Sequence, residues 1–135
     1  MQYWLVKSEP FKWSWEQQVK KGVEHWDGVR NYQASNNMKA MKIGDQAFFY
    51  HSNEGLEIVG IVEVVKEYYP DHTDETGRFG MVDFKALKPL PKPVSLKTIK
   101  ATPELEAMAL LKQSRLSVSP VRPEEWEFIC KMGGL

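Results

Sequence analysis

The chain has little cysteine, because Cys130 is the only one among its 135 residues. A single thiol excludes an intramolecular disulfide and a metal centre built from several cysteines. A reducing compartment fits this composition, and we expect a cytoplasmic location. The first apolar stretch, Tyr3 to Val6, is too short for a signal or membrane-spanning segment, so none is predicted.

The chain also lacks an excess of either charge: Lys plus Arg total 18, Asp plus Glu total 18, and the formal net charge is zero. This balance argues against a protein that coats a phosphate backbone, since such binding scales with the number of neutralised phosphates. A local basic patch, or recognition of a single nucleotide, stays open. With 42% hydrophobic and 27% charged residues, the composition is that of one globular domain spanning residues 1–135.

Several catalytic signatures are missing as well. The sequence contains no P-loop, no G-x-G-x-x-G and no G-x-S-x-G elbow. Ser8, Ser52 and Ser117 are candidate nucleophiles with His51 as a candidate base. His51 and Ser52 are neighbours in a predicted strand, however, and would point to opposite faces. Cys130 fits an apolar helix face as a structural thiol, so no catalytic residue is predicted.

Metal ligands are equally sparse. Asp71, His72, Asp74 and Glu75 stand close together in the stretch from Pro70 to Gly80, but they match no recognised ligand spacing. We therefore predict a solvated loop there, with no metal and no cofactor.

The elements that the sequence does indicate alternate between strands and helices. Ser14 and Gln17 form a capping box, which predicts the start of a helix, and Thr102-Pro103 opens another helical segment. Gly60 lies within a β-branched run, where it predicts a bulge or the close approach of another backbone or a ligand. Pro89, Pro91 and Pro93 predict an extended connector. Strands are expected at 3–7, 46–51, 57–69, 81–87 and 116–121, and helices at 15–21, 31–41, 96–100, 103–111 and 123–132. This order favours an α+β fold, a curled mixed sheet or small barrel with helices packed outside.

One constellation carries chemistry, and it combines residues 26–36 with residues 48–53. Trp26 precedes a Gly turn, an arginine and several amides, and an apolar strand ends abruptly at His51-Ser52-Asn53. An aromatic ring beside fixed donors and acceptors suits a planar polar ligand. The alternative is that Trp26 is a core residue and the polar side chains are caps and turns. The planar guanidinium group of Arg30, with its paired N–H donors, could orient an anion or a base edge.

The sequence resembles the EVE domain family over nearly its whole length. The resemblance is carried by residues 4–10 (WLVKSEP), 26–34 (WDGVRNYQA), 44–45 (GD), 48–53 (FFYHSN), 69–71 (YPD), 82–83 (VD), 115–118 (RLSV) and 120–121 (PV). It implies a PUA-like fold, similar to YTH and ASCH domains, and YTH domains bind a methylated adenine in RNA through an aromatic cage.

The family resemblance also implies a function and a site. It implies a non-catalytic module that recognises a modified nucleobase, such as modified cytosine in DNA or a modified base in RNA, with nucleic acid as the partner and no membrane. An enzyme acting on a modified nucleotide and a pocket for a free small metabolite are the alternatives. The implied site residues are Lys7 and Ser8 at the mouth, Trp26 as a stacking wall, Arg30, Asn31 and Tyr32 at the entrance, His51, Ser52 and Asn53 at the base edge, and Tyr69 and Pro70 closing the cage.

Two departures from the family pattern bear on the ligand. Ser35 stands where the family often has arginine, so a basic contact is expected to be missing. A tryptophan commonly found shortly before the Val82-Asp83 pair is absent, and Phe79 is the nearest aromatic residue. If that tryptophan supports the pocket wall in relatives, the ligand preference of this chain is expected to differ.

Overall fold

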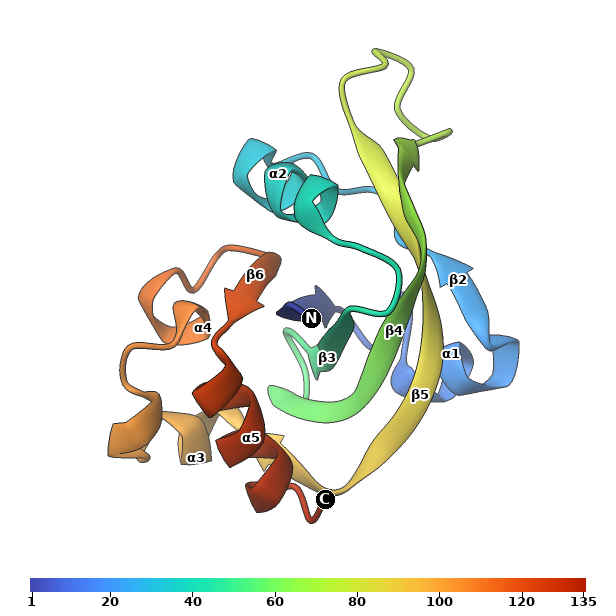
Figure 1. Ribbon diagram of the computed structural model, residues 1–135. Coiled ribbons are helices and arrows are strands. Elements are labelled where there is room, and N and C mark those ends of the chain that lie inside the picture. Colours follow the sequence, from blue (N-terminus) through green and yellow to red (C-terminus); the bar gives the residue numbers. More distant parts are fainter.

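The computed structural model describes residues 1–135, and its strands form one mixed six-stranded sheet in the order β2-β5-β4-β3-β1-β6. The strands are β1 (Tyr3–Ser8), β2 (Val23–His25), β3 (Gln46–His51), β4 (Glu57–Pro70), β5 (Gly80–Ser95) and β6 (Val118–Val121). β1 and β3 are parallel, and all other neighbours are antiparallel. The sheet curls without closing, so β2 and β6 remain its edges (Figure 1). The predicted α+β class with a curled mixed sheet is confirmed.

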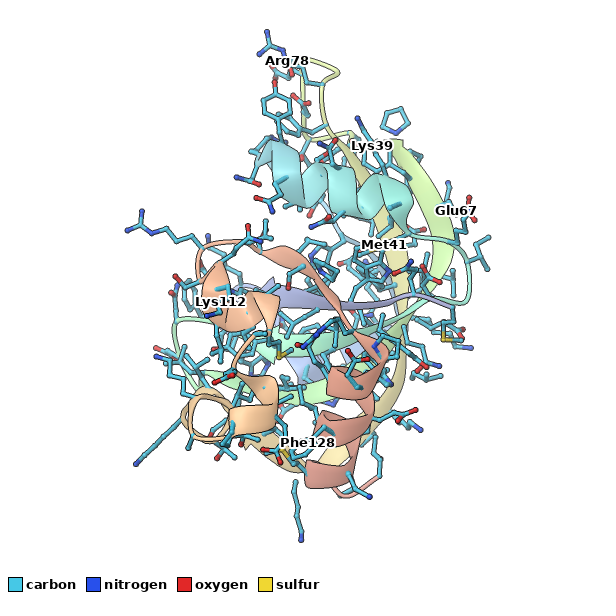
Figure 2. The ribbon with its side chains drawn as sticks, turned by 60° about the vertical axis from the view of Figure 1, so that its left-hand side comes forward. Lys39, Met41, Glu67, Arg78, Lys112 and Phe128 are labelled. Carbon is cyan, nitrogen blue, oxygen red and sulfur yellow. The ribbon has the colours of Figure 1, made fainter.

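Five helices and one 3-10 turn flank this sheet. They are α1 (Trp15–Lys21), α2 (Tyr32–Ala40), α3 (Leu96–Lys100), the 3-10 turn Pro103–Leu105, α4 (Ala109–Lys112) and α5 (Pro123–Met132). Figure 1 shows α3, α4 and α5 gathered on one side, with α2 apart from them beside the upper part of β4 and β5. The loop between β4 and β5 projects beyond the body, and Arg78 marks its tip in Figure 2. None of the helices is long and apolar enough to cross a membrane.

The core lies on both faces of the sheet. Alternation along β1 sends Trp4 and Val6 into one buried cluster and Leu5 into the other. β3 does the same with Phe49 on the first side and Phe48 on the second. The helix α5 covers the second cluster, to which Trp126 and Ile129 belong. β3 is therefore buried on both sides, as its run of consecutive apolar residues indicates.

The proline-containing connector predicted after residue 87 is wrong, because β5 continues through it to Ser95. Its pairing with β4 is irregular there: Gly60 faces Pro89 and Ile58 faces Val94, so β5 advances five residues while β4 passes two. Within such a bulge the regular ladder hydrogen bonds are interrupted. The missing proline N–H groups therefore cost little, and the strand persists.

Two other element predictions need correction. The single helix expected at 103–111 is a 3-10 turn and a short α4, because the buried residues Leu105, Met108 and Leu110 do not share one face of a continuous helix. The strand β2 was not predicted, since Val23–His25 is too short to show an alternating pattern. It forms only by pairing with Asp83–Lys85 of β5.

Gly60 lies at a break in strand register, as its place in the β-branched run predicts. Its partner on β3 is Phe49, while the next residue, Tyr50, pairs with Ile58. The ring of Trp15 covers Gly60 so closely that a Cβ atom at this position would lie 2.5 Å from it. Trp15 in turn meets the Phe49 ring edge-on at 5.4 Å. The close approach at Gly60 is therefore made by the first residue of α1 and not by the backbone of a ligand pocket.

Replacing Gly60 with alanine is expected to destabilise the protein by about 1–3 kcal/mol, because the added methyl overlaps the Trp15 ring. Urea denaturation of wild type and Gly60→Ala measures this loss. In a Trp15→Ala background the same change should cost much less. An equal loss in both backgrounds would show that the ring is not the obstacle.

Candidate functional site

A cavity of about 450 Å³ opens where β1 ends and the chain leaves β2. This volume is within the range of about 300–1,000 Å³ that is usual for small-molecule sites. Its ten lining residues include only two hydrophobic side chains, Trp13 and Trp26. The others are Lys7, Ser8, Glu9, Lys12, Glu24, His25, Asp27 and Gly28. We call this space the tryptophan cavity.

Trp26 belongs to the core and to the cavity at once. Only 8% of it is exposed, and its ring meets the edges of Phe49 at 5.6 Å and Phe84 at 5.4 Å. Its backbone N–H donates to Val82 at 2.8 Å, which continues the path of β2 along β5. Trp26 is therefore a core residue that also lines the cavity, and its role as a stacking wall stays a prediction.

Trp13 is the more accessible of the two rings. It is half-buried, and its Nε1–H donates to the Gln18 Oε1 atom at 2.9 Å. Its backbone carbonyl accepts a hydrogen bond from the Ser8 hydroxyl, which ties the loop after β1 to the strand end. Trp13 was not predicted as a site residue, because its distance to Trp26 depends on the loop between Glu9 and Ser14.

Charges of both signs surround the cavity. The Lys12 ammonium lies 3.4 Å from Glu9, and Lys7 Nζ donates to the Ser114 carbonyl at 2.7 Å. Burial lowers the pKa of Lys7. Glu9 and Lys12 were also missed as lining residues, although Glu9 follows Ser8 directly in the string that carried the family resemblance.

The wall formed by Trp26-Asp27-Gly28 is held by Asp71, whose side chain is 0% exposed. The Asp71 carboxylate accepts hydrogen bonds from Gly28 N at 2.8 Å, Arg30 Nη1 at 3.0 Å and the Thr73 hydroxyl at 2.6 Å. Burial alone would raise the pKa of Asp71, but the hydrogen bonds from Thr73, Gly28 and Arg30 outweigh it and lower the pKa to about 2. The prediction of a solvated loop is thus wrong at Asp71, because the carboxylate pairs with groups 43 and 41 residues earlier in the chain.

Three residues predicted at the entrance do not line the tryptophan cavity. Arg30 is engaged by Asp71 and lies over the Phe79 ring, 5.7 Å from its centre. Tyr32 packs against the same ring at 5.0 Å and is exposed. Asn31 caps α2, because its side-chain oxygen accepts from Ala34 N at 2.9 Å. Asn31 also lines a neighbouring cavity, described below.

The residues predicted to close the cage point elsewhere. The Tyr69 hydroxyl donates to Asp83, and burial together with this hydrogen bond raises the pKa of Tyr69 to about 12. Pro70 is exposed at the end of β4. Ser35 is buried, with its hydroxyl 2.8 Å from that of Tyr68, so it contributes to the fold rather than to a basic rim.

The polar residues at the end of β3 have two different roles. His51 does not line the tryptophan cavity. Its Nε2 atom accepts a hydrogen bond from the N–H of Trp15, the first residue of α1, at 3.1 Å. Ser52 and Asn53 line a second cavity of about 460 Å³. Since β1 and β3 are parallel, Ser8 and His51 lie side by side, and Lys7 lines both cavities.

The hydrogen bond at His51 predicts a pH-dependent stability. It requires a neutral Nε2 atom, and burial lowers the pKa of His51, with smaller opposing effects from Glu57 and Glu16. A lowered pKa in the folded state means that this stabilisation is complete above the unfolded value of about 6.5. It is lost as pH falls through the folded value.

We therefore expect the free energy of unfolding to fall between pH 7.5 and pH 5 more steeply in wild type than in His51→Gln. Glutamine keeps an acceptor but does not titrate in this range, and both proteins retain His25 and His72. Parallel pH profiles in urea denaturation would contradict the role of His51.

A third cavity, of about 350 Å³, extends the site beside the second one. Ser114 lines the second and third cavities, and Lys7 lines the first and second, so the three share lining residues. The second contains Lys100, and the third contains Lys112 and Arg115, with no acidic residue in either. Lys112 lies on α4, as Figure 2 shows. We call the lining of the second and third cavities the basic strip.

An open, curled mixed sheet with flanking helices and a polar, tryptophan-lined cavity at one strand end defines a domain of the PUA-like class. The chain belongs to the EVE domain family, whose model matches residues 2–132. The family predicted from the sequence is thereby confirmed.

Known relatives resemble the chain over almost its full length. Thymocyte nuclear protein 1 from Rattus norvegicus is 36% identical, covering 96% of this chain and 73% of that protein. A crystal structure of an Agrobacterium tumefaciens protein superimposes with a TM-score of 0.98 at 59% identity, covering 100% of this chain and 94% of that one. Human THYN1 protein, in complex with 5-methylcytosine containing DNA, superimposes with a TM-score of 0.93 at 33% identity, covering 100% and 99%.

Proposed function

We propose that this chain is a non-catalytic module that recognises a modified base in nucleic acid, with modified cytosine in DNA as the preferred class. The observation that carries the proposal is the similarity to human THYN1 protein, whose structure is a complex with 5-methylcytosine containing DNA and matches this chain over its full length. The tryptophan cavity supplies the kind of surface that such a ligand needs.

In this proposal the extruded base enters the tryptophan cavity and stacks on Trp13, with the exposed part of Trp26 behind it. Base–aromatic stacking is worth about 1–3 kcal/mol per base. Ser8, Glu9 and Lys7 at the end of β1 line the same space and supply polar groups for the base edge. Glu9 is suited to accept from an exocyclic amino group, as carboxylates do with cytosine.

The backbone of the nucleic acid follows the basic strip in the same proposal. The tryptophan cavity carries three carboxylates, Glu9, Glu24 and Asp27, beside Lys7 and Lys12, whereas the basic strip has lysine and arginine without acids. This difference in charge favours the phosphates at the basic strip and leaves the tryptophan cavity to the base. Few phosphates are neutralised in this way, which agrees with a net charge of zero.

Selectivity for the modification needs more than the methyl group itself. Burying one methyl is worth about 0.8 kcal/mol, or about fourfold in affinity. A larger preference requires that the unmodified base leaves a polar group unpaired in the cavity. Extrusion from a duplex costs a few kcal/mol, so single-stranded or mismatched sites should bind more tightly than perfect duplexes.

The test is a fluorescence-polarisation titration of wild type, Trp13→Ala and Arg115→Gln with matched 5-methylcytosine and cytosine oligonucleotides. Trp13→Ala removes a half-buried ring, so we expect it to fold and to lose about tenfold or more in affinity for the modified strand. Arg115→Gln removes a charge from the basic strip, so we expect it to weaken both ligands by the same factor.

The alternative functions are outcomes of the same experiment. Equal binding of both oligonucleotides by wild type and Trp13→Ala would overturn the proposal. A free methylated nucleoside that binds as tightly as the oligonucleotide would indicate a pocket for a small metabolite. Chemical conversion of the modified base would indicate an enzyme, although the basic nitrogen of His51 is engaged by α1. A cytoplasmic location stays a prediction.

A further inference from the structure

Two of the three histidines of the chain meet at the rim of the tryptophan cavity, although they stand far apart in the sequence. His25 ends β2, and His72 follows the buried Asp71 in the loop between β4 and β5. Their rings lie edge to face with centres 4.9 Å apart. Asp27 joins them, so that one ligand atom from each of the three residues lies within 4.8 Å of the others.

We propose that His25, Asp27 and His72 bind one divalent transition-metal ion of the zinc class. Two imidazoles and a carboxylate are a donor set that suits Zn²⁺, Co²⁺ and Ni²⁺ better than Mg²⁺ or Ca²⁺. Around a tetrahedral Zn²⁺ with bonds of about 2.0–2.1 Å, ligand atoms lie about 3.4 Å apart. His25 Nε2 and the Asp27 carboxylate are already 3.8 Å apart.

The surroundings of His25 match those of a metal-binding histidine. Its Nδ1 atom lies 3.2 Å from the Glu24 carboxylate, which leaves Nε2 on the side of Asp27. Such a pairing of one ring nitrogen with a carboxylate orients the other nitrogen toward a metal. Glu24 is itself held by Lys21 Nζ and by the backbone N–H of His25, each at 3.0 Å.

The backbones that carry the ligands are tied together. The hydrogen bond from Gly28 N to Asp71 joins the residue after Asp27 to the residue before His72. β2 holds His25 against Asp83 of β5. The three side chains remain half-buried or exposed, so their rotamers can close on an ion without a change in the backbone.

An ion in this place would change the electrostatics of the cavity mouth. His25 and Asp27 line the tryptophan cavity, which also holds the carboxylates of Glu9 and Glu24. A divalent cation offsets this negative charge on one side of the opening. With three protein ligands, positions in its coordination sphere stay open to water or to an anionic group.

The test uses the untagged protein and Zn²⁺, followed by NMR of the histidine imidazoles and by calorimetry. We expect Zn²⁺ to bind with a stoichiometry of one and to shift the ring resonances of His25 and His72. His51, the third histidine, serves as an internal control and should not respond, because its Nε2 atom is occupied by Trp15 N–H. Mg²⁺ at the same concentration should have no effect.

Amino-acid substitutions distinguish this site from another possible metal ligand, the Cys130 thiol. His72→Gln should weaken Zn²⁺ binding by at least about tenfold, and Glu24→Gln by about 10–100-fold, as the loss of an orienting carboxylate does elsewhere. Cys130→Ser should bind as wild type does. Wild-type affinity in folded His25→Gln and His72→Gln, or equal shifts at all three histidines, would overturn the proposal. Since no nucleic acid is present, either outcome is independent of the proposed base recognition.

Discussion

Trp26→Ala is expected to destabilise the protein by about 3–5 kcal/mol, the usual cost of removing a large aromatic side chain from a core. The ring is 8% exposed and meets Phe49 and Phe84 edge-on, so its loss leaves a cavity beneath the sheet face. Urea denaturation at neutral pH measures this loss.

Trp13→Ala is the matched control for this variant. Both tryptophans line the same cavity, but Trp13 is half-buried, and its side chain donates a hydrogen bond to Gln18. We therefore expect a clearly smaller loss of stability in Trp13→Ala. If Trp26→Ala lost less than about 1 kcal/mol, Trp26 would not be a core residue. A binding defect in Trp26→Ala would then report a lost contact with the ligand and not a loss of the folded structure.

The second large effect is expected at Ile61, which is 1% exposed in the central strand β4. It pairs with Phe48 of β3 and belongs to the cluster that α5 covers. Ile61→Ala should cost about 2–5 kcal/mol, because the neighbouring strands cannot collapse into the space.

Ile43 offers the same substitution on the surface, since it is 65% exposed. Ile43→Ala is expected to change the free energy of unfolding by no more than about 0.5 kcal/mol. Chemical denaturation of the two variants, fitted with a common m-value, gives the comparison. A loss at Ile61 under about 0.5 kcal/mol would show that β4 does not carry the core.

Local patterns in the chain were sufficient for most of the helices and strands. The capping box at Ser14 and Gln17 begins α1, and the Asn31 side chain caps α2, because each cap depends on residues only three apart. The continuous apolar run of β3 and the β-branched run of β4 indicate buried strands without any tertiary information. These patterns span few residues and do not depend on which strand is the partner.

The candidate site was predicted only in part, for a physical reason. Lys7, Ser8 and Trp26 line the tryptophan cavity as expected. Trp13 joins them through a loop, and Arg30 is drawn away by Asp71. The position of Trp13 depends on the path of the loop between Glu9 and Ser14, which shows no periodic sequence pattern. The position of Arg30 depends on the buried carboxylate of Asp71, 41 residues away.

By itself, the sequence determined the α+β class, most of the strands, the helix caps and membership of the EVE domain family. These follow from apolar and β-branched runs, from short-range hydrogen bonds and from residue strings that stay together along the chain. Only the tertiary structure decided that His51 supports α1, that Asp71 is buried, and that His25 and His72 meet at one rim. Each of these depends on strand pairing and loop closure, which bring distant residues within reach of one hydrogen bond or one ring contact.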